Sequence, residues 1–246
     1  MIIQRDLERD YLGGLELEKE MKSFENLEKK KILQGFFKTG VGQYGHGDVF
    51  LGINVPVTRL VCSKYELDFS DIEKLLLSEI HEFRVAGLFI LVRKFEKEKD
   101  EAERKKIVEF MLSKTSRINN WDLVDLSAPK ILGKYLIGKK DRSILYKLAK
   151  SDNLWERRIA VVSTYSLIKN GEYSDTLRLS QELISDKQDL MHKAVGWMLR
   201  EVGKKDEKVL VEFLEKNCSK MPRTALRYSI ERMDEKKRKY FMRKKK

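Results

Sequence analysis

The stretch Trp155-Glu-Arg-Arg-Ile-Ala-Val-Val-Ser-Thr-Tyr165 carries the pattern that decides the fold. A charged turn opens it, and Ile159, Val162 and Tyr165 then recur every three to four residues, which places them on one face of a helix. A related stretch, His81-Glu-Phe-Arg-Val-Ala86, also has an arginine followed by small apolar residues. The recurrence of such a segment predicts a repeating arrangement of helices.

Helical periodicity extends over almost the whole chain. The apolar residues follow it at Ile72, Leu75, Leu76 and Ile80, at Ile107, Phe110 and Met111, and at Val209, Phe213 and Leu214. Helix-start signals stand at Ser70-Asp71, Asp100, Ser151-Asp152 and Ser174-Asp175, and breakers stand at Gly133, Gly138, Asn170-Gly171 and Pro222. We count roughly a dozen helices and no alternating run long enough for a convincing strand.

Short, regularly spaced helices favour an all-α fold in which antiparallel pairs of about 40 residues stack side by side. This is the arrangement of HEAT-like repeats, which form a superhelical solenoid. The repeat is degenerate, so an ordinary α-helical bundle is the alternative. We treat residues 1–235 as a single domain and residues 236–246 as a basic C-terminal tail.

The net charge of +12 is concentrated at the C-terminus, where residues 236–246 hold eight Lys or Arg and no acid. The rest of the chain therefore carries only about +4. A solvated, frayed terminus and a phosphate-binding arm both account for such a tail.

Other features exclude whole classes of function. Cys62 and Cys218 fit no zinc or redox spacing, which indicates reduced thiols in a cytoplasmic protein. The N-terminus turns charged at once, so we expect no signal peptide. The longest apolar run, Val85–Val92, is too short to span a membrane. No histidine has metal-ligand spacing, and we expect His81 to start or end a helix and to bond to backbone.

One segment breaks the helical pattern, Gly40-Val-Gly-Gln-Tyr-Gly-His-Gly-Asp-Val-Phe-Leu-Gly-Ile-Asn-Val-Pro56. Its five glycines suggest positive φ angles or close backbone approach. It lacks the Gly-Lys-Ser/Thr ending of a phosphate-binding loop, so a connecting loop is the simpler interpretation. Pro56 is expected to start the next helix. Tyr44 is a candidate DNA contact, and a packed tyrosine is the alternative.

Each of the three tryptophans has a charged residue three or four positions away, a spacing that puts ring and charge on one face of a helix. The pairs are Trp121 with Asp125, Trp155 with Arg158, and Trp197 with Lys193 and Arg200. A single helical tryptophan is usually a core residue, and we keep that interpretation for Trp155. The other two recur within a wider pattern of motifs.

Six stretches together resemble the DNA alkylation-repair glycosylases of the AlkD type. They are Asp48-Val-Phe-Leu-Gly-Ile-Asn-Val-Pro-Val-Thr-Arg59, His81-Glu-Phe-Arg84, Asn120-Trp-Asp-Leu-Val-Asp125, Trp155-Glu-Arg-Arg158, Lys193-Ala-Val-Gly-Trp-Met-Leu-Arg-Glu201 and Met221-Pro-Arg-Thr-Ala-Leu-Arg-Tyr228. Each alone is weak, but their order and spacing from about residue 40 to residue 230 are specific. The resemblance implies HEAT-like helical pairs with a basic concave face that holds duplex DNA.

The resemblance also implies an activity, the excision of cationic alkylated purines such as 3-methyladenine and 7-methylguanine from double-stranded DNA. By motif, the catalytic residues are Trp121, Asp125 and Trp197. Arg158, Arg200 and Lys193, together with Tyr44 of the glycine-rich segment, are the expected DNA contacts. We expect no cofactor, no metal and no membrane association, and a monomeric protein in the cytoplasm.

Several interpretations stay open. Asp122 lies close to Asp125 and caps the turn or favours the helix N-terminus, whereas Asp125 has the four-residue relation to Trp121. An ion pair between Asp125 and Arg158 is a structural alternative for both residues. A HEAT-like protein that binds unusual DNA structures without excision, and a helical adaptor for another protein, are the competing functions.

Overall fold

The computed structural model describes residues 13–244, so the charged N-terminus and the last two lysines of the expected tail lie outside the described residues. All regular elements between residues 13 and 244 are helices, apart from an isolated parallel bridge between Val49 and Ile80. The prediction of an all-α fold is confirmed. None of these helices is long and apolar enough to cross a membrane.

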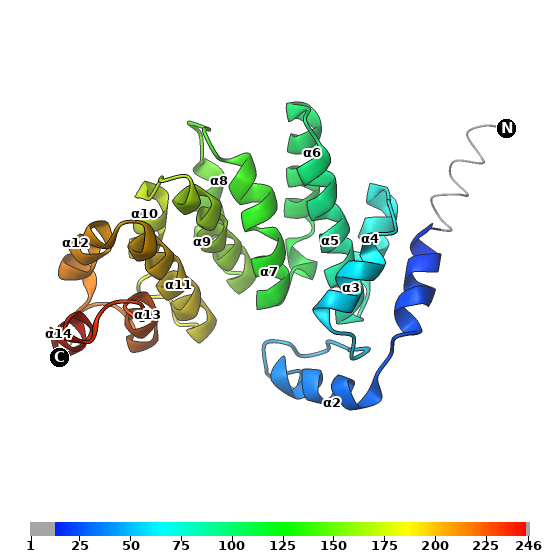
Figure 1. Cartoon of the computed structure of the whole chain (residues 1–246), viewed down its shortest axis with the longest axis horizontal. Helices are drawn as coiled ribbons and strands as arrows, with labels where there is room; N and C mark the ends of the chain where they lie inside the picture. Colours follow the sequence, from blue (N-terminus) through cyan, green and yellow to red (C-terminus); the bar gives the residue numbers. More distant parts are fainter. Residues whose placement is uncertain (1–12, 245–246) are drawn as a thin grey trace. The chain divides into compact units, whose positions relative to one another are not determined.

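The chain forms two compact units, Met1–Ser127 and Ala128–Lys246. The division falls inside residues 1–235, which the sequence suggested as a single domain. In the first unit, a helix over residues 13–22 precedes α2 (Leu27–Phe36), α3 (Val55–Cys62), α4 (Phe69–Leu77), α5 (His81–Lys97), α6 (Glu101–Ser113), the 3-10 turn η1 (Thr115–Arg117) and α7 (Trp121–Ser127). The helices α3, α4, α6 and α7 pack against α5 (Figure 1). The apolar residues in the middle of α5 are buried.

The second unit is built around α9 and α11. Its elements are the π-helical turn η2 (Pro129–Gly133), α8 (Ser143–Ala149), α9 (Leu154–Lys169), α10 (Ser174–Glu182), α11 (Asp189–Lys205), α12 (Glu207–Asn217), α13 (Arg223–Ser229) and α14 (Glu235–Lys244). The helices α8, α10 and α11 contact α9, and α12 and α13 contact α11. Both α9 and α11 therefore pack against helices that precede them and helices that follow them in the sequence.

The helix boundaries follow the local signals closely. Asp100 caps α6 by accepting two backbone N–H bonds, and Pro56 lies in the first turn of α3, where its missing N–H is harmless. The pair Asn170-Gly171 ends α9. Gly133 was expected to break a helix, but it is the last residue of the helical turn η2. A Cβ at Gly133 would stand 2.2 Å from the Ser163 carbonyl oxygen, so this glycine permits close packing against α9.

Residues 236–244 of the expected basic tail belong to α14 (Glu235–Lys244), which contacts α12 within the second unit. Phe241 is buried, with 1% of its surface exposed. Lys237 lies 2.5 Å from Glu207, and Lys244 pairs with Glu215. These contacts hold α14 to the unit by apolar burial and by charge.

The segment from Gly40 to Asn54, called here the glycine segment, is fixed to the start of α5. Val49 accepts a bond from the His81 N–H at 2.8 Å, and the buried Glu82 carboxylate accepts three more from the segment. Its donors are the N–H groups of Leu51 at 3.0 Å, Gly52 at 2.8 Å and Ile53 at 3.2 Å. Three N–H bonds satisfy a buried carboxylate well, so this loop has one fixed path.

Gly52 and Gly42 provide a matched test of that path, since both have positive φ, +85° and +75°. A Cβ at Gly52 would lie 2.2 Å from the Asn26 carbonyl oxygen, whereas one at Gly42 meets nothing within 4 Å. Gly42→Ala should cost about 1 kcal/mol of unfolding free energy for its φ alone. Gly52→Ala should cost roughly 2 kcal/mol more, because backbone must shift. Urea denaturation measures both, and equal losses would contradict the fixed path.

Phe241 tests whether α14 is an integral part of the fold. Phe241→Ala should lower the unfolding free energy by roughly 3 kcal/mol, because a buried aromatic side chain is lost. Tyr240→Ala, at a neighbouring position that is 50% exposed, should cost roughly 1 kcal/mol or less. Thermal unfolding at matched salt compares them, and a Phe241 variant as stable as the wild type would show that α14 contributes no stability.

Candidate active site

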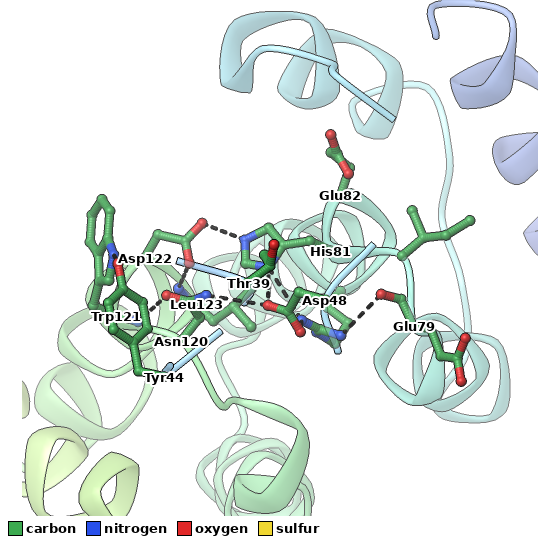
Figure 2. A network of polar contacts seen from close by, with 12 residues as sticks. Thr39, Tyr44, Asp48, Glu79, His81, Glu82, Asn120, Trp121, Asp122 and Leu123 are labelled. Atoms are coloured by element: carbon green, nitrogen blue, oxygen red, sulfur yellow. Dashed lines mark hydrogen bonds and ion pairs between the residues drawn. The ribbon is translucent and has the colours of Figure 1, made fainter. Parts of the chain in front are cut away.

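Three segments of the first unit meet around the buried carboxylate of Asp48 (Figure 2). Arg84 of α5 donates from Nη2 to Oδ1 at 2.6 Å. On the other oxygen, Oδ2, His81 Nδ1 lies at 3.2 Å and Asn120 Nδ2 at 3.3 Å. A buried carboxylate requires such donors in place of water. Asp48 thus connects the glycine segment to α5 and to the residue before α7.

His81 bridges two carboxylates through the two nitrogens of its ring. Nδ1 faces Asp48, and Nε2 lies 2.7 Å from Oδ2 of Asp122 in the first turn of α7. Ionised carboxylates only accept, so an imidazole between two of them carries a proton on each nitrogen. His81 does begin a helix, as expected. The expectation that it bonds to backbone holds for its N–H but is wrong for its ring, which binds side chains.

The cluster contains two carboxylates, Asp48 and Asp122. They face two basic side chains, His81 and Arg84. Burial lowers the pKa of His81, but the charge of Asp122 and the hydrogen bonds to Asp122 and Asp48 outweigh it and raise the pKa to about 9. Burial raises the pKa of Asp48, but the hydrogen bond from His81 and the charge of Arg84 hold it below its usual range. At neutral pH His81 is therefore protonated and Asp48 is ionised.

Trp121, the first residue of α7, is half-buried and held on two sides. Its Nε1 donates to the Tyr44 hydroxyl at 3.3 Å, and that hydroxyl donates to the Phe36 carbonyl at 3.4 Å (Figure 2). One face of the indole stacks on Phe37, with ring centroids 5.4 Å apart and planes 15° apart. The sequence left Tyr44 as either a DNA contact or a packed residue, and the structure places it beside Trp121.

Asp125 lies about one turn after Trp121 on α7 and is half-buried. Residues four apart share a helix face, so carboxylate and indole lie on the same side. Asp122 is engaged elsewhere, because Oδ2 contacts His81 and Oδ1 accepts the Leu123 N–H at 2.8 Å. Asp125 stays the predicted catalytic carboxylate, on its motif and its four-residue relation to Trp121.

In the second unit, Trp197 is half-buried on α11, with its ring 5.9 Å from that of Tyr165 on α9. Lys193 and Arg200 lie one turn before and one turn after it. Lys193 is 2.8 Å from Asp189, and Arg200 pairs with Glu231. Asp189 and Glu231 are exposed, and such surface ion pairs contribute little stability, whereas Arg200 also lies 3.7 Å from the buried Glu201.

Arg158 is buried, with 5% of its surface exposed, and its Nη1 donates to the Leu190 carbonyl at 2.7 Å. It therefore ties α9 to the first turn of α11, and its contact with a DNA phosphate stays a prediction. Its neighbour Arg157 pairs with Asp186 at 2.7 Å. Trp155 is buried near the start of α9, as expected for a core residue.

A hollow of about 360 Å³ opens beside Lys193 in the second unit. Its lining residues come from α11, α13 and the loop after α13: Asp189, Lys193, Thr224, Arg227, Tyr228 and Glu231. Arg227 is exposed there, and the sequence did not single it out. Its position in the stretch Met221–Tyr228, one of the six matching stretches, was the available signal.

The structure brings Trp121 together with Tyr44 and Asp125 in the first unit. It groups the remaining predicted residues of the site, Trp197, Arg158, Lys193 and Arg200, on α9 and α11 of the second unit. The convergence of the two groups on one lesion stays a prediction. The Asp48–His81–Asp122 bridge was missed altogether.

Comparison with known proteins identifies the family. The model of the DNA alkylation repair enzyme family matches residues 17–233. A structure described as a predicted DNA alkylation repair enzyme from Enterococcus faecalis has a TM-score of 0.65 and 17% identity, over 86% of this chain and 97% of that one. AlkD2 from Streptococcus mutans has a TM-score of 0.52 and 19% identity, over 90% of this chain and 97% of its own.

Both structural likenesses concern the fold. No curated protein matches the sequence. The family model, in contrast, spans nearly all of the described residues and includes all six matching stretches. The chain therefore belongs to the DNA alkylation repair enzyme family, which gives it a role in the repair of alkylated DNA.

Proposed function

We propose that the protein is a DNA glycosylase that hydrolyses the N-glycosidic bond of cationic alkylated purines, such as 3-methyladenine and 7-methylguanine, in duplex DNA. The observation that carries the proposal is the arrangement on α7. Trp121 and Asp125 share one face of this helix, both are half-buried, and the indole is held by Tyr44 and Phe37. The proposed protein acts as a monomer on double-stranded DNA.

The chemistry suits these two side chains. Departure of an alkylated purine leaves positive charge on the deoxyribose, in a state that resembles an oxocarbenium ion. A carboxylate beside C1′ stabilises that charge and orients the attacking water. Aromatic faces attract cations, so the indole of Trp121 stabilises the same charge. The base is already a good leaving group, so no strong general acid is required.

The second unit supplies the proposed complement to this arrangement. Trp197 offers another indole, while Lys193, Arg200 and Arg227 offer cations to the backbone phosphates. Arg158 holds α11 through one N–H bond to the Leu190 carbonyl, and in the proposed complex its other N–H groups contact a backbone phosphate. The net charge of +12 supports binding to a polyanion.

Asp125→Asn tests the catalytic assignment. We expect it to slow the release of 7-methylguanine from methylated duplex DNA by about 10²-fold or more, because a neutral amide cannot stabilise the developing cation. Duplex affinity should stay nearly unchanged. Asp152→Asn makes the same chemical change at an exposed carboxylate outside α7 and should leave the rate unaltered. Undiminished release by the Asp125 variant would refute its role.

Excision by the wild-type protein separates the proposed enzyme from a DNA-binding relative without activity. Purified protein incubated with methylated duplex DNA should release free base and leave alkali-labile sites. Binding to that DNA without release of base would support the alternative, a HEAT-like protein that recognises DNA structure.

Arg227 tests the phosphate-binding surface of the second unit. Arg227→Ala should weaken binding uniformly across sequences and reduce the slope of log K against log salt by about 1, since one phosphate contact is lost. Arg178→Ala removes an exposed arginine on α10 that pairs with Glu182, and it should change neither quantity. Titrations at several salt concentrations measure both variants. An unchanged slope for Arg227→Ala would remove it from the DNA-binding surface.

A further inference from the structure

The helix that carries the proposed chemistry is short. It spans seven residues, Trp121–Ser127, too few for its own hydrogen bonds to make it rigid. Its first turn is instead held from outside: Asn120 contacts Asp48, and Asp122 contacts His81. The orientation of the indole on this turn thus depends on side chains that belong to other elements.

We propose that His81 is a positioning residue for the lesion site, because it joins Asp48 of the glycine segment to Asp122 of α7 and so sets the orientation of the Trp121 indole. The role of the Trp121 orientation in catalysis rests on the proposed glycosylase function. The link between Asp48 and Asp122 through His81 rests on the observed contacts alone. We call the three residues Asp48, His81 and Asp122 the carboxylate bridge.

The carboxylate bridge holds both partners of the Trp121–Tyr44 hydrogen bond. Asp48 lies four residues after Tyr44 in the glycine segment, and Asp122 directly follows Trp121 (Figure 2). Movement of either carboxylate away from His81 would shift the segment that bears one partner. Phe37 reinforces the link, since its ring lies 4.9 Å from that of His81 and 5.4 Å from that of Trp121.

The charged groups around His81 define how the bridge responds to protonation. Asp48 faces it from the glycine segment, Arg84 from α5 and Asp122 from α7, while Phe37 and Phe50 cover its ring. The next charge outward is Arg117 of η1, which interacts electrostatically with Arg84, Asp48 and Glu79. A neutral imidazole has one proton for two carboxylates, so one contact of the bridge loses its hydrogen.

The direction of the pH effect follows from the raised pKa of His81. Its value lies at 6.5 in the unfolded chain and at about 9 in the fold. The stabilisation by the bridge is therefore fully present below pH 6.5 and is lost as the pH rises through 9. In the folded protein His81 loses its second ring proton near pH 9, so the indole should lose its fixed orientation there.

The first experiment follows the Trp121 indole N–H of the full-length protein by NMR as the pH is raised, without DNA. Trp121→Phe identifies the signal by its disappearance. In the wild type the signal should shift with a midpoint near pH 9. Asp122→Asn removes the charge that raises the His81 pKa, so the midpoint should move to lower pH. His81→Gln should abolish the transition.

Two control variants separate the bridge from other causes. Tyr44→Phe removes the phenol at the indole, and the transition near pH 9 should persist in it. Asp68→Ala removes the N-terminal cap of α4, whose carboxylate accepts the Asp71 N–H at 2.8 Å. It should lower stability by about 1 kcal/mol, as a lost cap does, without shifting the indole signal.

The second experiment measures single-turnover excision at neutral pH from duplex DNA that holds one 7-methylguanine. His81→Gln should lower the rate of the chemical step by roughly 10²-fold, the usual effect of a misplaced site, with little change in DNA affinity. Asp68→Ala should excise at the wild-type rate. Asp122→Asn keeps an acceptor for His81 and should retain more activity than Asp122→Ala.

The outcomes distinguish this inference from the proposed function. A wild-type indole signal that does not titrate, or an His81→Gln protein that excises at the wild-type rate, would overturn the positioning role. Should His81→Gln fail to fold, the wild-type titration and Asp122→Asn still decide. Absence of excision by the wild type would instead refute the glycosylase proposal, and the indole titration would stand independently of it.

Discussion

Asp48 is a carboxylate kept away from water, and the arrangement of the first unit depends on the donors that surround it. Removal of an ion from water costs several kcal/mol, so each donor must be supplied by the protein. Arg84 and His81 come from α5, and Asn120 stands just before α7. One buried charge thereby brings together segments that are far apart in the sequence, and the candidate catalytic helix is one of them.

Where the structure is local, the sequence predicts it well. The periodicity of Ile72, Leu75 and Leu76 matches their burial in α4, and Asp100 caps α6 as a helix-start signal should. These features involve residues within one or two turns of each other. The pairing of Trp121 and Asp125 on α7 belongs to the same class, because one helical spacing decides it.

Where the structure is non-local, the sequence leaves it undecided. His81 contacts carboxylates 33 and 41 residues away, at distances that no period encodes. Arg158 shows the same limit, because the resemblance implied that it contacts DNA and the structure buries it. Its guanidinium instead binds the Leu190 carbonyl, 32 residues later, because α9 packs against α11. A helical repeat thus predicts which face is apolar, but it does not predict which charges are buried between helices.

The buried Glu82 carboxylate determines how rigid the glycine segment is before it meets any ligand. The carboxylate fixes three successive amides of the glycine segment, so a loop rich in glycine loses its conformational entropy when the protein folds. Tyr44, earlier in the segment, is held by hydrogen bonds to Trp121 and to the Phe36 carbonyl, so a ligand that touched it would meet a preorganised surface. The entropic cost of ordering this segment therefore falls on the folding of the first unit and not on the binding of a ligand.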